Sequence, residues 1–352
     1  MAQSFTYYPL GNAQTMLLEL GNGKKVLFDF ANVKTDDASD KRWNIEEEFE
    51  DYDNIDAVMF THAHEDHIKG SAEFFRMEYY RTKDEGVTIG ELWLSSAFVA
   101  DTRCTCEDAR VIRQEARARL KAGKAVKIFG HGKALSKWLE TSEISEESVK
   151  HLIFHAGENI PHDLGDEVSF FLHAPFSEEC DDVDDKNDPS VVMQVRLHNV
   201  TRETNILITG DTPCDVLDDV ILKTQEKENE EYLHWDLYDI PHHCSHTGLC
   251  EAFDEEIIPT ENVQWLLEQS GENAFMVASC KALADADSPP PSEEAEKAYK
   301  DYKKSDVTFR ITMEYPKRSA PEPMVFTIDS RGLTPNSPKS TKFSSTPAPR
   351  VG

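Results

Sequence analysis

The sequence lacks the features of membrane-spanning and secreted proteins. It contains no run of about 18 apolar residues, and residues 1–14 have neither the basic start nor the apolar stretch of a signal peptide. The seven cysteines are an odd, scattered set without the paired spacing of a zinc knuckle, and Cys104 and Cys106 form only a C-x-C. We therefore expect a soluble, cytoplasmic protein with reduced thiols and no membrane partner.

Positive charge is also scarce. The chain has 37 Lys and Arg against 66 Asp and Glu, a net charge of -29, which would repel DNA and anionic membranes over most of the surface. The stretch 103–137 is the exception, with ten basic and three acidic residues. One interpretation is a solvated helix face. The other is a binding surface for a phosphate-bearing substrate, a nucleic acid or a protein partner, with Arg113, Arg117 and Lys121 as the contacts.

The 352 residues, 39% of them hydrophobic, are enough to bury a sizeable core, and we expect one domain over 1–333. Short apolar runs bounded by turn residues predict strands at 15–20, 25–30, 56–60, 92–96, 125–130, 151–156, 168–174, 190–197, 205–210, 237–240, 275–279, 307–313 and 324–328. Helices are predicted at about 70–82, 106–122, 133–150, 212–228 and 291–303. This pattern favours an α/β protein in which helices cover two sheets. The Pro/Ser/Thr-rich stretch 334–352 is predicted to be a disordered tail.

Four metal-binding side chains occur within six residues, in the sequence HAHEDH at 62–67. The motif begins where a predicted buried strand stops, the usual place for a site in layered α/β proteins. Imidazole nitrogens and carboxylate oxygens bind zinc, manganese and iron. A loop can direct His62 and His64 to one cation and Asp66 and His67 to a second. The alternative is a cluster in which these side chains cap loop amides.

Further candidate ligands follow two other predicted strands. Asp211 ends NILITGD, and His242 and His243 follow LYDIP. Taken alone, Asp211 in a Gly-Asp turn is more often a turn or cap residue. Because each candidate directly follows an apolar run, all of them could converge on one edge of the core, where Asp211 could bridge two cations.

The stretch THAHEDHIKG (61–70) resembles the H-x-H-x-D-H signature of the metallo-β-lactamase fold superfamily. In their order, YYPLGNAQTMLLELGNGKKVLFDFAN (7–32), NDPSVVMQVRL (187–197), ILITGDT (206–212) and DIPHHCSHTG (239–248) are similar to the hydrolase domain of ComEC-type DNA-uptake proteins. The resemblance covers roughly residues 5–280. It implies a four-layer αββα sandwich, in which 71–150 would be a family-specific, largely helical insertion.

The resemblance also implies roles for individual residues. His62 and His64 would hold one of two divalent cations, Zn or Mn. Asp66, His67 and His243 would hold the other, with Asp211 as the bridge. Asp66 and His242 are expected to act in catalysis, His242 as a phosphate contact or proton donor. Which of His242 and His243 is the ligand stays open.

The sequence departs from the superfamily pattern at three places. No Pro-Gly-His-Thr turn supplies a further histidine; His173 could substitute, although a histidine satisfied within the core is the alternative. The late His-Pro of the ComEC-type branch is missing from DADSPPPSEEAEKAY (285–299). Cys244 replaces the glycine of P-H-H-G-S, which a backbone outside the left-handed region would tolerate. Cys244 and Cys250 are expected to be buried rather than ligands.

The implied activity is hydrolysis by a metal-bound hydroxide. A phosphodiesterase or nuclease is favoured by the resemblance and by the basic stretch. Two alternatives stay open. One is a hydrolase of a small ester, lactone or thioester, which suits the overall negative charge better. The other is a non-catalytic metal-binding module that docks into a larger complex through the basic stretch.

Overall fold

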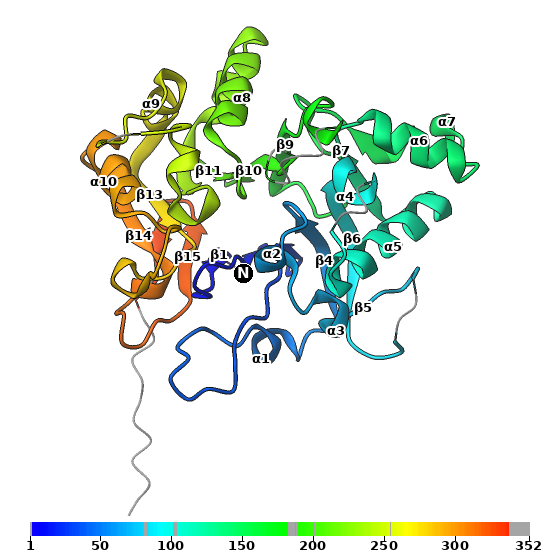
Figure 1. Cartoon of the computed structure of the whole chain (residues 1–352), viewed down its shortest axis with the longest axis horizontal. Helices are drawn as coiled ribbons and strands as arrows, with labels where there is room; N and C mark the ends of the chain where they lie inside the picture. The colour runs from blue at the N-terminus through cyan, green and yellow to red at the C-terminus, as the bar shows by residue number, and fades with distance from the viewer. Residues whose placement is uncertain are drawn as a thin grey trace, which may run out of the picture.

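Two β-sheets packed face to face form the middle of the molecule (Figure 1). The computed structural model describes residues 2–80, 83–100, 104–181, 187, 189–199, 201–253 and 255–337. The larger sheet has the strand order β16-β15-β1-β2-β3-β4-β6-β7-β8, with the short β5 beside β6. Its strands are β1 (Gln3–Tyr7), β2 (Met16–Glu19), β3 (Lys25–Phe28), β4 (Asn54–Phe60), β5 (Phe75–Arg76), β6 (Val87–Ser95), β7 (Val126–Phe129), β8 (Ile153–Phe154), β15 (Met324–Asp329) and β16 (Gly332–Pro335).

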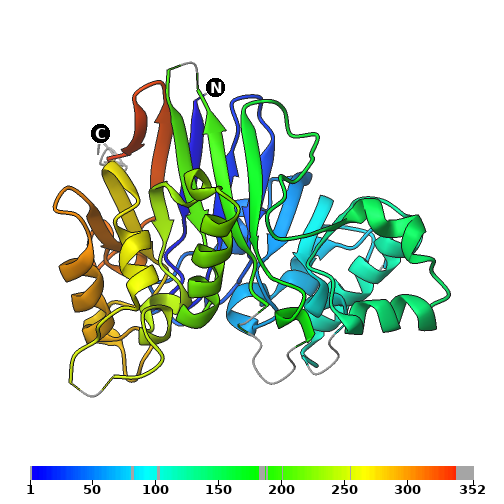
Figure 2. The same cartoon turned by 90° about the horizontal axis from the view of Figure 1, so that it is seen from above.

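The smaller sheet has the order β14-β13-β12-β11-β10-β9. Its strands are β9 (Val168–Ala174), β10 (Val192–His198), β11 (Glu203–Ile208), β12 (Trp235–Asp239), β13 (Ser270–Ala278) and β14 (Thr308–Ile311). Figure 2 shows the last strands of the chain, in red, beside β1, in blue, within the larger sheet. The chain therefore completes the smaller sheet before it returns to the larger one.

Each sheet has a parallel part, and these parts position the loops of interest. Strands β3, β4, β6 and β7 run parallel in the larger sheet, and β11, β12, β13 and β14 do so in the smaller one. The carboxyl ends of parallel strands lie at one edge of a sheet. The loops after β3 and β4 therefore meet those after β11 and β12 at one edge of the sandwich.

Alternation along the strands explains the layers. In β2 and β3, Leu18 and Phe28 face the core between the sheets, whereas Leu17 and Leu27 face the outer side of the larger sheet. Successive side chains of a strand point to opposite faces, so strands that are apolar at every position need cover on both sides. A second and a third hydrophobic cluster provide that cover beneath helices on the two outer faces.

The helices form the outer layers. They are α1 (Ile45–Phe49), α2 (Glu65–Ile68), α3 (Ser71–Phe74), α4 (Ser96–Ala100), α5 (Glu107–Ala122), α6 (Lys133–Thr141), α7 (Glu146–Val149), α8 (Cys214–Glu226), α9 (Glu261–Leu267) and α10 (Glu293–Tyr302). In Figure 1, α8, α9 and α10 lie on one side of the molecule and α4 to α7 on the other. The arrangement confirms the four-layer αββα sandwich predicted from the sequence.

Short 3-10 helices occupy several connections. They are η1 (Lys150–Leu152), η2 (Glu179–Asp181), η3 (Glu230–Leu233), η4 (His242–Cys244), η5 (His246–Gly248), η6 (Leu283–Asp285) and η7 (Thr312–Glu314). Among the described residues, no helix combines the length and the apolar character needed to cross a bilayer.

Every stretch predicted to hold a strand contains one, but two helix predictions are wrong in part. Helix 70–82 ends at Phe74, because Phe75 then pairs with Val87 in β6. Helix 133–150 divides into α6, α7 and η1. Strands β1, β5 and β16 and helices α1, α2, α4 and α9 were not predicted. Strand β16 extends into the expected tail, whose residues 338–352 lie outside the described part of the chain.

The range 71–150 is built into the sandwich rather than appended to it. It supplies helices α3 to α7 and also strands β6 and β7 of the larger sheet. Strand β6 pairs with β4 along the length of β4. Helix α5 contacts the residues that follow HAHEDH through Asp108. The Asp108 carboxylate accepts hydrogen bonds from the amides of Gly70 (3.0 Å) and Ala72 (2.8 Å). The helical part of this range thus supports the loop that carries HAHEDH.

Candidate metal centre

The candidate ligands lie together at the edge where the two sheets meet. His62, His64, Asp66 and His67 follow β4 of the larger sheet, whereas Asp211 and His243 follow β11 and β12 of the smaller one. Two groups result: Asp66, His67, Asp211 and His243 form one, and His62, His64 and Asp211 form the other. Within each group the ligand atoms lie within 4.8 Å of one another. The structure therefore brings together all six residues expected to bind metal.

Asp211 belongs to both groups and directs one oxygen to each. Its Oδ2 lies 3.6 Å from His62 Nε2, and its Oδ1 lies 3.1 Å from His67 Nε2 and 3.6 Å from His243 Nε2. Oδ1 is buried and faces the ring nitrogens of two other candidate ligands, His67 and His243. A buried carboxylate is costly unless opposite charge neutralises it. The position fits a bridge between two cations, and Asp211 caps no helix, because Pro213 is the N-cap of α8.

Hydrogen bonds at the far side of two imidazoles orient their free nitrogens toward the centre. His67 Nδ1 donates to Asp29 Oδ2 over 2.7 Å, and His243 Nδ1 donates to the Ser279 carbonyl over 2.7 Å. In each ring Nε2 is thereby directed at the other ligands, and the two Nε2 atoms are 3.3 Å apart. Such outer partners fix the tautomer and orientation of metal-binding histidines.

Thr61 links these outer contacts. Its amide and hydroxyl both donate to the Asp29 carboxylate at 2.7 Å, and its hydroxyl lies 3.2 Å from His62 Nδ1. Since that hydroxyl donates to Asp29, it can accept from His62 Nδ1, which leaves His62 Nε2 free to face His64 Nδ1 at 3.0 Å. Asp29 and Thr61 were not predicted as site residues; Asp29 directly follows strand β3.

The shifts in pKa reflect burial opposed by close charges. Burial would raise the pKa of Asp211, but His243, His67 and His62 hold it well below its usual range. Burial would lower the pKa of His67, but Asp211 and Asp29 raise it well above its usual value. The pKa of His62 is lowered, by burial and by the charge of His67. Without metal, the pair His67 and Asp211 therefore holds a proton that a cation would displace.

Asp66 lies at the open side of the centre. Its side chain is 37% exposed, and its Oδ2 lies 3.3 Å from His243 Nε2. Burial would raise its pKa, but the hydrogen bond from His243 and the charges of His67 and His243 hold it below the usual value. Asp66 is therefore ionised at neutral pH and can serve as a ligand. His64, at the N-cap of α2, makes no side-chain cap hydrogen bond, which argues against a cluster that only caps amides.

The turn that carries His242 and His243 has an unusual backbone. His242, His243 and Cys244 have φ angles of 49°, 52° and 64°, so three successive residues other than glycine are left-handed. Such residues cost of order 1 kcal/mol each and persist where the surroundings enforce them. From the sequence, cysteine in place of glycine at position 244 was expected to be tolerated if the backbone there is not left-handed. The backbone at Cys244 is left-handed, so this condition is not met. Cys244 and Cys250 are buried and belong to neither ligand group, as expected.

Gly210 allows the two sheets to approach closely at the centre. Its φ is +54°, and a Cβ at this position would lie 2.9 Å from Thr61 Cβ. The Gly210 carbonyl also accepts a hydrogen bond from the His242 amide over 3.0 Å. Glycine is required here because the turn before Asp211 rests directly on the start of the HAHEDH loop.

His242 adjoins the centre without belonging to either ligand group. Its Nε2 lies 3.9 Å from Asp211 Oδ2, and its Nδ1 lies 2.8 Å from the Thr247 hydroxyl, which in turn donates to Ser245 Oγ. The side chain is 24% exposed. His243 therefore belongs to a candidate ligand group, and His242 lies at the open side, oriented by Thr247.

His173 does not complete the first ligand group. Its Nδ1 lies 3.2 Å from the Thr224 hydroxyl and its Nε2 lies 3.0 Å from the Tyr232 carbonyl, so both ring nitrogens are engaged in the core of the smaller sheet. Burial, opposed by the Tyr232 contact, lowers its pKa to about 4. This is the satisfied histidine that the sequence offered as the alternative to a ligand.

The lowered pKa of His173 predicts a pH effect on stability. In the unfolded chain His173 is protonated below its ordinary pKa of about 6.5, whereas in the folded chain it stays neutral down to about pH 4. Between pH 7.5 and pH 5, wild type should lose about 2 kcal/mol more unfolding free energy than His173→Gln, which cannot titrate. Urea unfolding of both proteins at the two pH values measures the difference. Equal losses would contradict the prediction.

Arg103, in the basic stretch 103–137, lies outside the described residues. Of the other nine basic residues of this stretch, four are buried or half-buried and five are exposed, namely Arg110, Lys121, Lys124, Lys133 and Lys137. Arg113 is 4% exposed and donates to the Cys104 carbonyl over 2.7 Å, so its prediction as a substrate contact is wrong. Arg117 is half-buried, donates to the Val99 carbonyl and stacks on Trp138. Lys121 is exposed, but it lies about 20 Å along α5 from the end that adjoins the metal motif.

Arg119 is a buried residue of this stretch, and its contacts lead to a stability prediction. Its Nε lies 2.7 Å from Glu115 Oε1, and its guanidinium also donates to the carbonyls of Ile89, Gly90 and Ala125. A lysine keeps the charge but cannot reach all four acceptors. Arg119→Lys should lower the unfolding free energy by about 2 kcal/mol. Denaturant unfolding tests this, with the exposed Lys121→Ala as a control that should change it by less than about 0.5 kcal/mol.

Comparisons with known proteins give fold likenesses at low identity. By sequence, the chain matches no family model and no curated protein. Among solved structures, it resembles a diphosphatase from the PhnP family (11% identity, 93% of this chain and 98% of that chain, TM-score 0.35) and unliganded yeast PDE1 (12%, 88% and 98%, TM-score 0.46). It also resembles a class B3 di-zinc metallo-β-lactamase from an Alaskan soil metagenome (11%, 84% and 89%, TM-score 0.30). Resemblance to the ComEC-type branch stays a prediction.

Proposed function

We propose that this chain is a metal-dependent hydrolase that cleaves a phosphodiester, with two divalent cations held by its two ligand groups. The observation that carries the proposal is Asp211, a buried carboxylate shared by both groups, with Oδ2 facing His62 and Oδ1 facing His67 and His243. His62 and His64 would hold one cation, and Asp66, His67 and His243 the other. The nitrogen and oxygen donors suit zinc, manganese and iron alike.

A pair of divalent cations supplies an activated water at neutral pH and neutralises the charge of an anionic transition state. The protein's own contribution is to fix the ligands before substrate arrives. Asp29 and the Ser279 carbonyl orient His67 and His243, and the close packing of Gly210 on Thr61 sets Asp211 between the groups. Asp66, the exposed ligand, lies on the side from which substrate enters.

His242 is suited to contact the substrate. Its pKa is lowered by burial, partly offset by Asp211. A phosphate brought next to the ring would favour the protonated form, which can donate to a phosphate oxygen or to the leaving group. In His242→Gln we expect kcat to fall while metal content stays unchanged, because His242 belongs to neither ligand group.

A small diester is the favoured substrate rather than a long nucleic acid. The net charge of -29 disfavours extended contact with a polyanion, and the buried Arg113 and Arg119 cannot offset it. The exposed Arg110 is paired with Glu107, whereas Lys121, Lys124, Lys133 and Lys137 are also exposed. If nucleic acid is bound through this stretch, changing Lys121 and Lys124 to Glu would weaken binding and reduce its salt dependence.

The test is hydrolysis by the zinc-loaded and manganese-loaded protein. Bis(p-nitrophenyl) phosphate, short DNA and RNA, a lactone and a thioester are compared, before and after chelation. The proposal expects cleavage of the diester that chelation abolishes and that the double change Asp66→Ala with His67→Ala also abolishes. Turnover of the lactone or thioester alone would identify the small-ester alternative. Two bound cations without any turnover would identify a non-catalytic module.

A further inference from the structure

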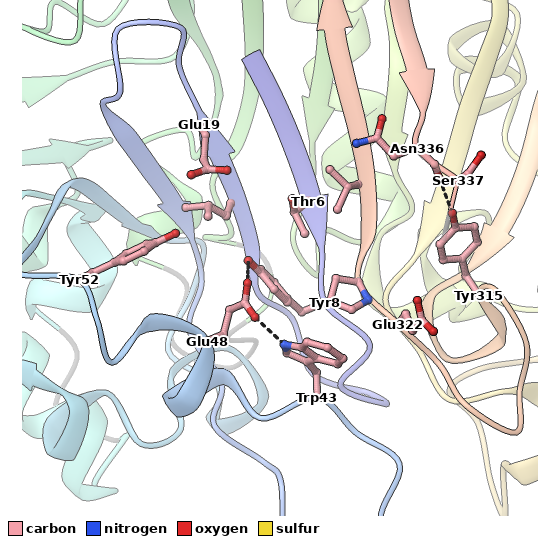
Figure 3. A pocket seen from close by; sticks show the side chains of 13 residues that line it. Thr6, Tyr8, Glu19, Trp43, Glu48, Tyr52, Tyr315, Glu322, Asn336 and Ser337 are labelled. Atoms are coloured by element: carbon pink, nitrogen blue, oxygen red, sulfur yellow. Dashed lines mark hydrogen bonds between the residues drawn. The ribbon is translucent and has the colours of Figure 1, made fainter. Parts of the chain in front are cut away.

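A cavity of about 620 Å³ lies on the outer face of the larger sheet, over β1, β2 and β15 (Figure 3). Its floor is formed by outward-facing side chains of these strands, among them Thr6, Leu17 and Val325. Segments that are far apart in the sequence close it from two sides: Trp43 to Tyr52 on one, and Tyr315 to Pro323 on the other. None of the lining residues belongs to the metal ligand groups.

Aromatic side chains form much of the wall. In Figure 3, Tyr52 lies at one end and Tyr315 at the other, with Tyr8 and Trp43 between them. Tyr315 is held in place by a hydrogen bond of 2.7 Å from its hydroxyl to the Asn336 carbonyl. The faces of such rings attract organic cations, most strongly where water is partly excluded.

Carboxylates are the charged groups of the cavity. Glu19, Glu48 and Glu322 line it, and no Lys or Arg is among the described residues that line it. Glu48 is fixed in place, because its two oxygens accept hydrogen bonds from the Tyr8 hydroxyl (3.3 Å) and from Trp43 Nε1 (2.9 Å). A positioned carboxylate between aromatic rings supplies an ion pair for the same ligand that the rings attract.

One ring of the cavity wall already has a cation against it. Lys25 Nζ lies 4.9 Å from the centre of the Tyr52 ring and bonds to the Gly23 carbonyl, outside the lining set. This single ammonium cannot balance three carboxylates, and the surrounding protein is strongly acidic. The cavity therefore selects for positive charge by both its walls and its field.

We propose that this cavity binds an alkylammonium group, with Glu48 as the counter-ion and Trp43, Tyr8, Tyr52 and Tyr315 as the aromatic wall. The ligand class follows from the aromatic rings and carboxylates of the wall, and from the lack of a basic side chain among the described residues that line the cavity. The site is independent of the metal centre and of the reaction proposed for it. The group could belong to a free organic cation or to a methylated lysine side chain of a peptide, which have the same binding chemistry.

The test is calorimetric titration of the metal-loaded protein with choline, with its uncharged analogue 3,3-dimethylbutan-1-ol, and with Nα-acetyl-trimethyllysine amide. The proposal expects choline to bind at least about tenfold more tightly than the uncharged analogue. Tighter binding of the lysine derivative than of choline would assign a peptide as the source of the group. The reverse order would assign a free cation.

Two lining variants and one control complete the test. Glu48→Gln removes the charge and keeps an acceptor for Trp43, and Trp43→Leu removes a ring; each should weaken choline binding about five- to tenfold. Glu47→Gln, on the same helix but outside the lining, should not. Circular dichroism and thermal unfolding of each variant show whether it is folded, whatever the activity of the metal centre. Equal affinity for choline and its uncharged analogue, or choline binding unaffected by both lining variants, would overturn the proposal.

Discussion

Asp211→Asn should lose both cations and lower hydrolysis at least about a thousandfold. The substitution keeps the shape of the side chain, but a neutral amide cannot bridge two cations as a carboxylate does. Both ligand groups depend on this residue, because Oδ2 faces His62 while Oδ1 faces His67 and His243. Metal content by elemental analysis and the rate on bis(p-nitrophenyl) phosphate measure the two effects separately.

The matched control for this variant is Asp219→Asn. Asp219 is on α8, close to Asp211 in the sequence, and pairs at the surface with Lys223. It should leave metal content and rate unchanged. Added zinc should also raise the melting temperature of wild type but not of Asp211→Asn, since only a protein that binds the ion is stabilised by it. Two cations bound by Asp211→Asn would refute the shared-ligand arrangement.

Asp29→Asn should weaken metal binding about 10- to 100-fold. Asp29 belongs to neither ligand group; it accepts from His67 Nδ1, from the Thr61 amide and from the Thr61 hydroxyl. An asparagine must present its NH2 group to one of these donors or lose one of the bonds. His67 then loses the contact that fixes its orientation, and Nε2 is no longer directed at Asp211.

Titration of the metal-free proteins with zinc measures this loss, and Asp36→Asn, an exposed residue in the following loop, is the control. A positioning role requires that saturating zinc restores most of the activity of Asp29→Asn. An Asp29→Asn protein with unchanged zinc affinity and low activity would mean that Asp29 acts in the reaction by another route.

The ligands could be predicted because they obey a local rule. HAHEDH, Asp211 and His243 each follow an apolar run, and the carboxyl ends of parallel strands meet at one edge. Asp29 directly follows strand β3, but it was not predicted as a site residue because Phe30 continues the apolar run beyond it. Its role appears only when the fold sets His67 next to it.

The basic stretch shows where composition misleads. Arg113 lies in the buried stripe of α5, with Ala109, Ile112, Ala116 and Leu120 at helical spacing. A count of charges along the chain does not distinguish that face from the exposed one that carries Arg110 and Lys121. The left-handed turn at 242–244 contains no glycine, and its one signal in the sequence is that Cys244 stands where P-H-H-G-S has glycine.

The contact of Gly210 with Thr61 has a consequence for fragments of this chain. Each ligand group draws residues from both halves of the sequence, so an N-terminal piece that contains HAHEDH has most of the metal-binding residues but no bridge. A C-terminal piece has the bridge and little else. Metal binding thus reports whether the two pieces have associated. Mixed together, they would bind the ions only as a reassembled pair.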